Sequence, residues 1–476
     1  MPLSSVRRLY YRTAAALAWR RLRSLSGQAL QRRAERAALR AFHRAARRVP
    51  AYAALLRERS VNPDDVRDIE SFRRLVPLTD KQSVFAENDL PSLCLDGKTG
   101  NATRVYTSSG YSGVFSFGLE TGGDARRGRA MLDLLLTMYF HVASRRTLLI
   151  NTLPMGVQVP ASLPVKFDSS VRSDAVIAVV KAAGGTCQQT VIVGEHPFLK
   201  KVLEEGLDAG VDWPSYRVSL VTGAEVVPES FRSYAGAILG HDPADPERGQ
   251  TLVTLGVSEV GLLVGFETEG CRRIRRLAFR DEALSRAVFG EAPFLPTFVQ
   301  YFPRSLFIET PTDEAGRPRL IITTADSRRR IPLIRYSTGD WAEVRTHRQV
   351  RQALKSCGRG DLVPDIELPF LVMWGRGKSL AVAGRELFPE QIEEALYTDP
   401  AVAAATTANF RMASQGGKLH LTFQLRPAYQ CSPTLEDAFR DLMGRSLGIP
   451  VEVRLVCYKD FREALDVCYQ RKFQHI

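Results

Sequence analysis

The spacing of apolar side chains divides the chain into three stretches, of which the first is helical. Residues 5–58 are poor in glycine and proline, and Leu39, Phe42, Ala46 and Val49 recur at intervals of three and four residues. This period places the four side chains on one face of an α-helix, with most arginines opposite. The pattern predicts a helix that packs on the body of the protein. Alternatively, its basic face meets an anionic membrane surface or an acidic partner.

Between residues 100 and 345, short β-rich runs alternate with helical segments. We expect strands at Thr147–Asn151, Gln189–Val193, Val218–Thr222, Leu252–Leu255 and Leu320–Thr324, and helices at 127–140, 172–183, 197–209 and 228–239. This alternation is typical of an α/β fold with mainly parallel sheets covered by helices.

The pattern changes again near residue 375. Residues 380–476 predict, in order, a strand, a helix at 389–397, strands at 401–408 and 418–426, a helix at 434–446 and a strand at 451–457. We therefore expect three parts: a basic helical extension (1–45), a large α/β domain (46–376) and a small α+β domain (377–476).

Composition and charge narrow the classes of protein. The 476 residues are 45% apolar and 25% charged, which excludes collagen, coiled-coil and disordered chains. Residues 1–50 hold 13 arginines and one acid, Glu35, so they account for most of the net charge of +13. Because the rest of the chain is close to neutral, we expect no nucleic-acid partner.

The seven cysteines are scattered and form no Cys-x-x-Cys pair. We expect reduced thiols in a cytoplasmic protein, without a structural metal. No run of 18 apolar residues is present, so no transmembrane helix is expected. The arginine-rich start is compatible with a mitochondrial transit peptide, but Arg12 and Arg20 flank too short an apolar run for a secretory signal.

A loop rich in hydroxyl groups follows a possible strand at Thr103–Tyr106. The segment Thr107-Ser-Ser-Gly-Tyr-Ser-Gly113 can wrap phosphate oxygens, because glycine permits close approach of backbone N–H groups. It lacks the spacing of a Walker A loop, and an ordinary turn is the structural alternative.

Three carboxylates stand where ligands are commonly bound. Glu225 and Glu259 each follow an expected strand, and an acid there can hold Mg²⁺ on a nucleotide phosphate. Asp340, in a tight turn, could accept both hydroxyls of a ribose. The structural alternatives are a helix N-cap at Ser258 with a first-turn acid, and a plain β-turn at Asp340.

Taken in order, these motifs resemble the adenylate-forming superfamily, and specifically its phenylacetate–CoA ligase-like branch. Ser108–Gly113 is similar to the phosphate loop SSGTTGKP, and Thr222–Glu225 to the adenine-side motif TGGE. Gly256–Glu259 resembles YGLSE, and Ile334–Asp340 resembles the ribose motif IRYRTGD. The lead-in and hinge segments also match, at Arg48–Tyr52, Val61–Asp65, Val76–Lys81, Gly375–Ser379, Gly384 and Leu387–Glu394, so that residues 44–476 are covered.

The resemblance implies a two-step ligation. A small carboxylic acid attacks the α-phosphate of ATP, pyrophosphate leaves, and the acyl-adenylate passes its acyl group to a thiol of CoA or of the phosphopantetheine of a carrier protein. It also implies a large adenylate-forming domain and a mobile C-terminal domain that pivots at Lys378. The resemblance does not decide whether the protein is a monomer or a homodimer.

The resemblance also assigns roles to residues. The 107–113 loop would bind the β- and γ-phosphates, Glu259 would hold Mg²⁺, Asp340 the ribose hydroxyls, and the catalytic Lys472 the carboxylate and α-phosphate oxygens. The residues expected to bind ATP are Thr107, Ser108, Ser109, Gly110, Tyr111, Ser112, Gly113, Gly223, Ala224, Glu225, Val257, Ser258, Asp340 and Arg376.

The sequence also departs from the family pattern. Val114-Phe115 replaces the Lys-Pro of the phosphate loop, which removes a cation, and Leu255 replaces the aromatic residue of YGLSE. Only Cys271 remains of the Cys/His cluster that the branch often carries, so no zinc is expected. The terminal motif is reduced to Arg471-Lys472-Phe473. Two alternatives are transfer of the acyl group to an amine and a degenerate homologue that only binds nucleotide.

Overall fold

The computed structural model of the chain describes residues 3–108, 113–154, 156–223, 226–242 and 245–461, together with residue 475. The chain forms two compact units, each made of several segments. The first consists of Met1–His141, Thr254–Val288 and Thr297–Arg376, and the second of Val142–Val253, Phe289–Pro296 and Gly377–Ile476.

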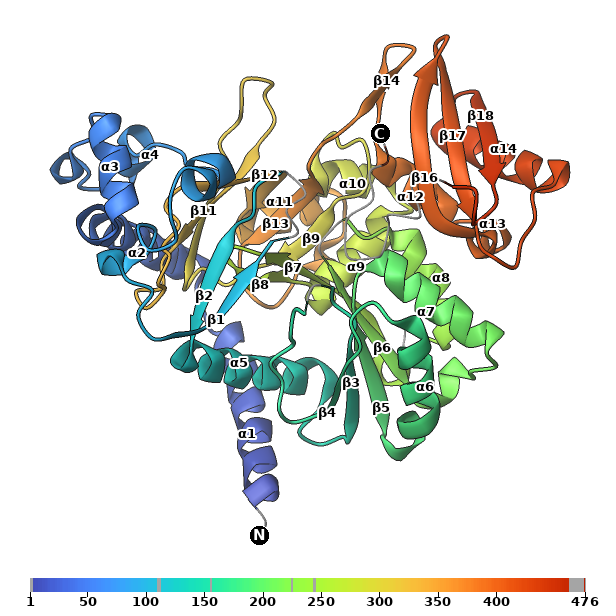
Figure 1. The fold of residues 1–476 in the computed structure, drawn as a ribbon, viewed down its shortest axis with the longest axis horizontal. Helices are drawn as coiled ribbons and strands as arrows, with labels where there is room; N and C mark the ends of the chain where they lie inside the picture. The colour runs from blue at the N-terminus through green and yellow to red at the C-terminus, as the bar shows by residue number, and fades with distance from the viewer. Residues whose placement is uncertain are drawn as a thin grey trace. The chain divides into compact units, whose positions relative to one another are not determined.

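The N-terminal region is helical, as the apolar spacing predicts. It consists of α1 (Leu3–Arg23), α2 (Gly27–Arg48) and α3 (Pro50–Glu58) (Figure 1). The Ser26 side chain accepts a hydrogen bond from the Ala29 N–H and so caps α2, and the extended residue Val49 separates α2 from the proline that begins α3. Phe42 and Val49 are fully enclosed in an apolar cluster of the first unit, with Leu39 packed against it.

Antiparallel strands form the sheet of the first unit. In spatial order they are β10 (Leu306–Glu309), β11 (Arg319–Thr324), β12 (Tyr336–Arg345), β13 (Phe370–Gly375), β9 (Thr297–Gln300), β8 (Gly261–Phe266) and β7 (Thr251–Val257). A separate hairpin pairs β1 (Ala102–Thr107) with β2 (Phe117–Thr121). The helices of this unit include α4 (Ile69–Leu75), α5 (Gly122–Phe140), α9 (Glu269–Ala278), α10 (Glu282–Phe289) and α11 (His347–Ser356).

Parallel strands occur in the second unit. Here β4 (Val165–Asp168), β3 (Thr147–Asn151), β5 (Gln189–Val193) and β6 (Val218–Gly223) pair in this spatial order. Along the chain, α6 (Ser173–Ala183) lies between β4 and β5, α7 (His196–Asp208) lies between β5 and β6, and α8 (Glu229–Leu239) follows β6. The expected α/β class is therefore confirmed. The strand pairing is mixed: β4, β3, β5 and β6 pair parallel in the second unit, whereas the strands of the first unit pair antiparallel.

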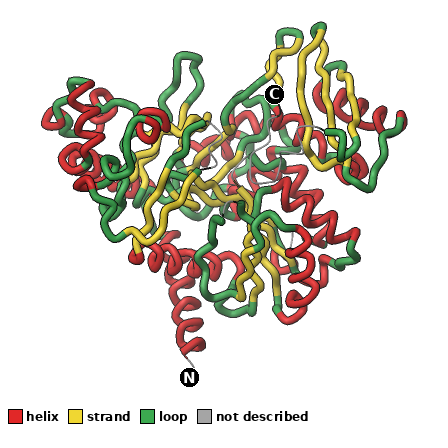
Figure 2. The backbone as a smooth tube through the Cα atoms, viewed as in Figure 1, coloured by secondary structure: helices red, strands yellow, loops and turns green. Residues whose placement is uncertain are grey.

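Residues 377–461 form a small α+β part of the second unit (Figure 2). Its elements are β14 (Leu380–Val382), β15 (Arg385–Leu387), α12 (Pro389–Leu396), α13 (Pro400–Ala405), β16 (Thr406–Gln415), β17 (Lys418–Leu425), α14 (Pro433–Leu447) and β18 (Val451–Val456). The strand expected at 401–408 is wrong in its first part. Pro400 begins a helical turn whose first N–H groups bond to the Asp399 side chain, and the strand starts only at Thr406.

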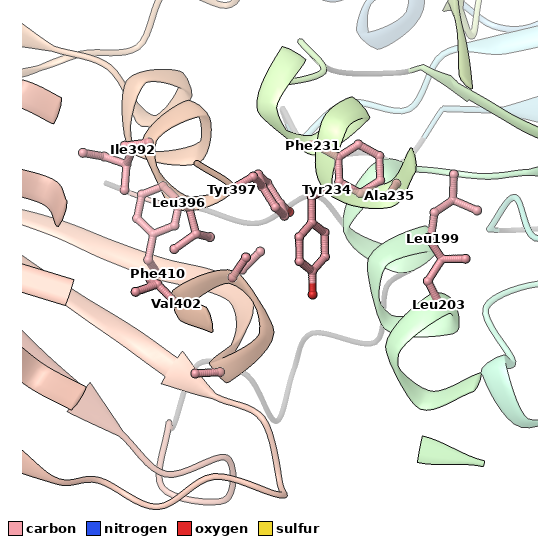
Figure 3. Packing of buried hydrophobic residues seen from close by; sticks show 14 of the residues in the cluster. Leu199, Leu203, Phe231, Tyr234, Ala235, Ile392, Leu396, Tyr397, Val402 and Phe410 are labelled. Atoms are coloured by element: carbon pink, nitrogen blue, oxygen red, sulfur yellow. The ribbon is translucent and has the colours of Figure 1, made fainter. Parts of the chain in front are cut away.

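Within the second unit, this α+β part packs on α7 and α8 through an apolar cluster (Figure 3). The Tyr397 ring lies 5.3 Å from the ring of Phe231 and 5.8 Å from that of Tyr234. The carboxylate of Glu394 accepts hydrogen bonds from the backbone N–H groups of Glu229 (3.0 Å) and Ser230 (2.7 Å), and so caps the start of α8.

Charged groups are enclosed in the same contact. The buried Lys200 ammonium donates to the carbonyl of Thr406 at 2.6 Å and pairs with Glu204. Arg426 lies 3.4 Å from the second carboxylate oxygen of Glu204. Removing one member of such a buried cluster leaves an uncompensated charge, so the cluster ties β16 and the chain after β17 to α7.

Candidate active site

The start of β12 is positioned by the segment that ends at Lys81. The Thr79 N–H donates to the carbonyl of Arg335 at 3.0 Å, and the Ser337 N–H donates to the carbonyl of Thr79 at 2.7 Å. The buried Thr79 hydroxyl donates to the carbonyl of Ile334 at 3.0 Å. These bonds form a short parallel bridge that holds Lys81 beside the beginning of β12.

Glu259 lies in the turn between β7 and β8, with its side chain largely buried. Its Oε1 accepts a hydrogen bond from the Tyr336 hydroxyl at 3.1 Å. Burial, followed by the charge and hydrogen bond of Glu259, raises the pKa of Tyr336, so the phenol remains a donor. The guanidinium of Arg329 binds the backbone carbonyls of Glu259 and Val260. Both the carboxylate and the backbone of Glu259 are therefore fixed.

Val257 and Ser258 complete this turn. The Val260 N–H bonds to the carbonyl of Val257 at 2.8 Å. Val257 is buried in the apolar core, whereas Ser258 is exposed. The alternative of a helix N-cap at Ser258 is wrong, because Gly261 begins β8 and pairs with Val257 across the hairpin.

Lys81 is a site residue that the motif analysis did not single out. Burial lowers the pKa of Lys81, the carboxylate of Glu259 acts in the opposite direction, and the guanidinium of Arg376 adds to the lowering. The ammonium group therefore lies within electrostatic reach of both groups. In the sequence, Lys81 could have been found as the last residue of Val76–Lys81, a lead-in segment that resembles the family.

Asp340 forms an ion pair with Arg376, whose Nε lies 3.5 Å from Oδ1 of the aspartate. The expectation of a tight turn at Asp340, with a plain β-turn as its alternative, is wrong, because the residue lies within β12. The register of β12 against β11 shifts between Ser337 and Trp341, and Gly339 adopts a φ of +80° there. A bulge of this kind re-aims a side chain next to an otherwise regular strand.

The described part of the hydroxyl-rich loop is the neck that joins β1 to β2. The Thr107 hydroxyl donates to the carbonyl of Ser116 at 2.9 Å, and the Ser116 N–H donates to the hydroxyl of Ser108 at 3.1 Å. Gly113 has a φ of +81°. Val114, at the position of the missing lysine, packs against the cluster that contains Val257 and Tyr336. The neck therefore lies at the same core as the Glu259 turn.

Other expected residues lie in the second unit or outside the described parts. Gly223 ends β6, and Lys378 is an exposed residue between β13 and β14, preceded by Gly377 with a φ of +63°. The residues outside the described parts are Ser109, Gly110, Tyr111, Ser112, Ala224, Glu225 and Lys472. Their roles remain predictions.

His475 is described and fixes the chain three residues after Lys472. Its carbonyl accepts a hydrogen bond from the Met412 N–H at 2.7 Å, and its Nδ1 lies 3.1 Å from the carbonyl of Phe410. The His475 ring stacks on the Phe410 ring at 4.1 Å. The end of the chain is therefore attached to β16.

No protein-family model and no curated protein sequence matches the chain, but solved structures do. The 2-hydroxyisobutyryl-CoA ligase in the postadenylation state, in complex with R3-HIB-AMP, matches with a TM-score of 0.66 and 12% identity, over 94% of this chain and 88% of that chain. The chain has the fold of this ligase. The same ligase with 2-HIB-AMP and CoA in the thioesterification state matches with a TM-score of 0.51 and 13% identity, again over 94% and 88%.

Proposed function

We propose that the protein is an ATP-dependent, AMP-forming ligase that activates a small carboxylic acid as an acyl-adenylate and transfers the acyl group to a thiol. The observation that carries the proposal is the fixed Glu259 carboxylate, which is bonded to Tyr336 and interacts electrostatically with Lys81, which in turn is within electrostatic reach of Arg376. The fold of an acyl-CoA ligase, on which the ordered motifs occur, supports it.

Glu259 and Asp340 would bind the nucleotide. In the described parts of the chain, no three Cys, His, Asp or Glu side chains gather into a metal cage. A single buried carboxylate fits Mg²⁺, which takes its other ligands from phosphate oxygens and water and neutralises their charge. Asp340 would accept the ribose hydroxyls, with Arg376 beside it fixing the orientation of the carboxylate.

Two lysines would supply the positive charge that the phosphate loop lacks. Lys81 is fixed to the body of the first unit and would face the leaving pyrophosphate. Lys472, on the small domain, would contact the carboxylate and α-phosphate oxygens during adenylation. Because a pentacovalent phosphate is stabilised mainly by placed charges, each cation should contribute to the first step.

The second step would follow a pivot at Lys378 that removes Lys472 and presents the acceptor thiol, of CoA or of a phosphopantetheine on a carrier protein. Such a pivot would separate α12 and α13 from α7 and α8. Gly377 and the exposed Lys378 provide a short segment that can absorb the change.

Pyrophosphate exchange with ATP, Mg²⁺ and a panel of carboxylic acids tests the proposal. We expect at least one acid to support exchange, and Lys81→Met to lower the rate by ~10²–10³. Lys98→Met, at an exposed position of the same unit, is the matched control and should leave the rate unchanged. ATP binding without exchange for any acid would identify a nucleotide-binding homologue instead.

The acceptor is tested separately, by mass analysis after addition of CoA, of a carrier protein bearing phosphopantetheine, or of an amine. A thioester supports the proposed reaction. An amide in the presence of the amine alone would reassign the second step to nitrogen transfer.

A further inference from the structure

One face of α1 is packed against the body of the first unit. Tyr11 and Ala15 are buried, and the Trp19 ring lies 5.9 Å from the ring of Tyr139 on α5. Arg7 pairs with the buried Asp133 of α5 at 3.1 Å. In Figures 1 and 2, α1 extends beyond α5 with the N-terminus at its far end. The helix is therefore held on one side only.

The opposite face of α1 is apolar and exposed. The exposed fractions are 52% for Val6, 54% for Leu9, 66% for Tyr10 and 58% for Leu17. Leu9 and Tyr10 lie three and four residues after Val6, and Leu17 lies seven residues after Tyr10. This spacing places the four side chains on one side of the helix, away from Tyr11. Four large apolar residues left in water on one short helix cost free energy and indicate a surface that is covered in use.

Positive charge surrounds this apolar stripe. Helix α1 contains six arginines and no acidic residue, and none of the described carboxylates lies within ion-pair distance of Arg12, Arg20 or Arg21. Its neighbour α5 adds three arginines and two aspartates, and each aspartate pairs with an arginine, Asp124 with Arg127 and Asp133 with Arg7. The helix pair is thus strongly cationic.

We propose that the exposed face of α1 docks on an anionic phospholipid bilayer, with the helix lying in the plane of the membrane interface. The apolar stripe would insert to the level of the acyl-chain boundary, Tyr10 would lie among the headgroups, and the flanking arginines would bind lipid phosphates. None of the helices in the described ranges combines the length and apolar character needed to cross a bilayer, so the contact is peripheral.

Electrostatic repulsion favours the anionic bilayer over a second copy of the chain at the exposed face of α1. A symmetric dimer through α1 would bring two strongly cationic helix pairs together, and the repulsion opposes it. An acidic protein would satisfy the arginines but would not need an apolar stripe at their centre. Dependence of binding on the apolar residues therefore distinguishes the bilayer from an acidic partner.

Flotation of the full chain with vesicles tests the proposal. We expect binding to vesicles of phosphatidylcholine with about 30% phosphatidylglycerol, and much weaker binding to phosphatidylcholine alone or at high salt. Leu9→Ser/Leu17→Ser should weaken binding at least about 10-fold, and Arg12→Gln/Arg20→Gln/Arg21→Gln about 100-fold. Leu207→Ser and Arg348→Gln/Arg351→Gln, at exposed positions on α7 and α11, are the matched controls and should bind as the wild type does.

A fluorescent variant tests membrane contact of α1 without relying on the folding of the serine and glutamine variants. Tyr10→Trp places an indole on the exposed face, and its emission should shift to shorter wavelength when anionic vesicles are added. Absence of binding or of this shift would overturn the proposal. Binding that depends on the arginines but not on Leu9 and Leu17 would point to an acidic protein, and self-association without vesicle binding would point to a second copy; either result also overturns it.

Discussion

At the scale of residues, hydrogen bonds and ion pairs fix the charged groups of the candidate site. Tyr336 holds an oxygen of Glu259, Arg329 holds the backbone of Glu259, and Arg376 lies beside Asp340. In the proposed reaction, charges that are already oriented would need little reorganisation, which lowers the barrier.

Asp340→Asn tests the ribose assignment. The amide is a weaker hydrogen-bond acceptor than the carboxylate and no longer pairs with Arg376, so we expect the KM for ATP in pyrophosphate exchange to rise about 10-fold. Asp361→Asn, at an exposed residue that pairs with Arg359, is the control. An unchanged KM for Asp340→Asn would remove this residue from the site.

Two thiols of the second unit lie close enough to be oxidised together. Cys431 Sγ is 3.5 Å from Cys457 Sγ, and both are free. With diamide as the oxidant, the thiols should lose two electrons and two protons to it and form a disulfide. Burial and the neighbouring Cys457 raise the pKa of Cys431, so the reaction should accelerate as the pH rises and thiolate forms.

The disulfide is measured as a loss of about two thiols in titration under denaturing conditions, with a peptide link between the two positions in a digest. Cys431→Ser should abolish the link, whereas Cys187→Ser should not. A digest that links other cysteines would contradict the pairing.

At the scale of elements, α12 connects the small α+β part to its surroundings in the second unit. The helix carries Glu394, which caps α8, and Glu393, which lies between two histidines. The Glu393 carboxylate oxygens are 3.6 Å from His196 Nε2 and 3.5 Å from His475 Nε2. One short helix thus links α7, α8 and the end of the chain.

Glu393 makes this link dependent on pH. Burial alone would raise its pKa, but the hydrogen bonds and charges of His196 and His475 lower it to about 2. Because the folded pKa lies below the ordinary value, Glu393 stabilises the fold fully above about pH 4.5, and this contribution is lost as the pH falls toward 2.

Urea unfolding of the wild type and of Glu393→Gln measures the effect. We expect the difference in the free energy of unfolding to be fully present above about pH 4.5 and to narrow as the pH falls toward 2. Glu314→Gln, at an exposed turn position, should show no such trend. A difference that stays constant with pH would mean that Glu393 acts through packing alone.

At the scale of the whole molecule, the proposed reaction requires one lysine to act in the first step and to withdraw in the second. Lys472→Ala should lower adenylate formation by ~10²–10³. ATP binding and thioester formation from pre-made acyl-adenylate should persist, because the second step uses another face of the small domain. Lys418→Ala, at the exposed start of β17 on the same domain, is the control.

Separate assays of the two half-reactions distinguish the outcomes. Equal loss of both in Lys472→Ala would indicate a structural lysine. If neither half-reaction falls, the catalytic cation lies elsewhere, and Lys459 becomes the next residue to test.

The sequence by itself determined most local structure and the fold class. Strands β3 and β5 have the expected bounds, because each has a short apolar centre with β-branched residues, which favours a strand of this length. The helical face of Leu39, Phe42 and Ala46 was equally readable from its period, whereas Val49, expected on the same face, is an extended residue after α2. The error at 401–408 has a local cause. A mixture of alanines and β-branched residues suits either state, and the Asp399-Pro400 start favours a helix.

Tertiary structure alone decided which charged groups meet. Lys81, Glu259 and Tyr336 are far apart in the sequence. The backbone bonds of Thr79 to Arg335 and Ser337 bring Lys81 to the start of β12, and the hydrogen bond from the Tyr336 hydroxyl connects β12 to Glu259. The bulge at Gly339 and the hairpin turn at Ser258 likewise depend on strand pairing. Sequence periodicity shows which residues of α1 share a face, but not which face packs against the protein. The contacts with Asp133 and Tyr139 of α5 determine the packed face, because the burial of a helix face depends on the element that packs against it.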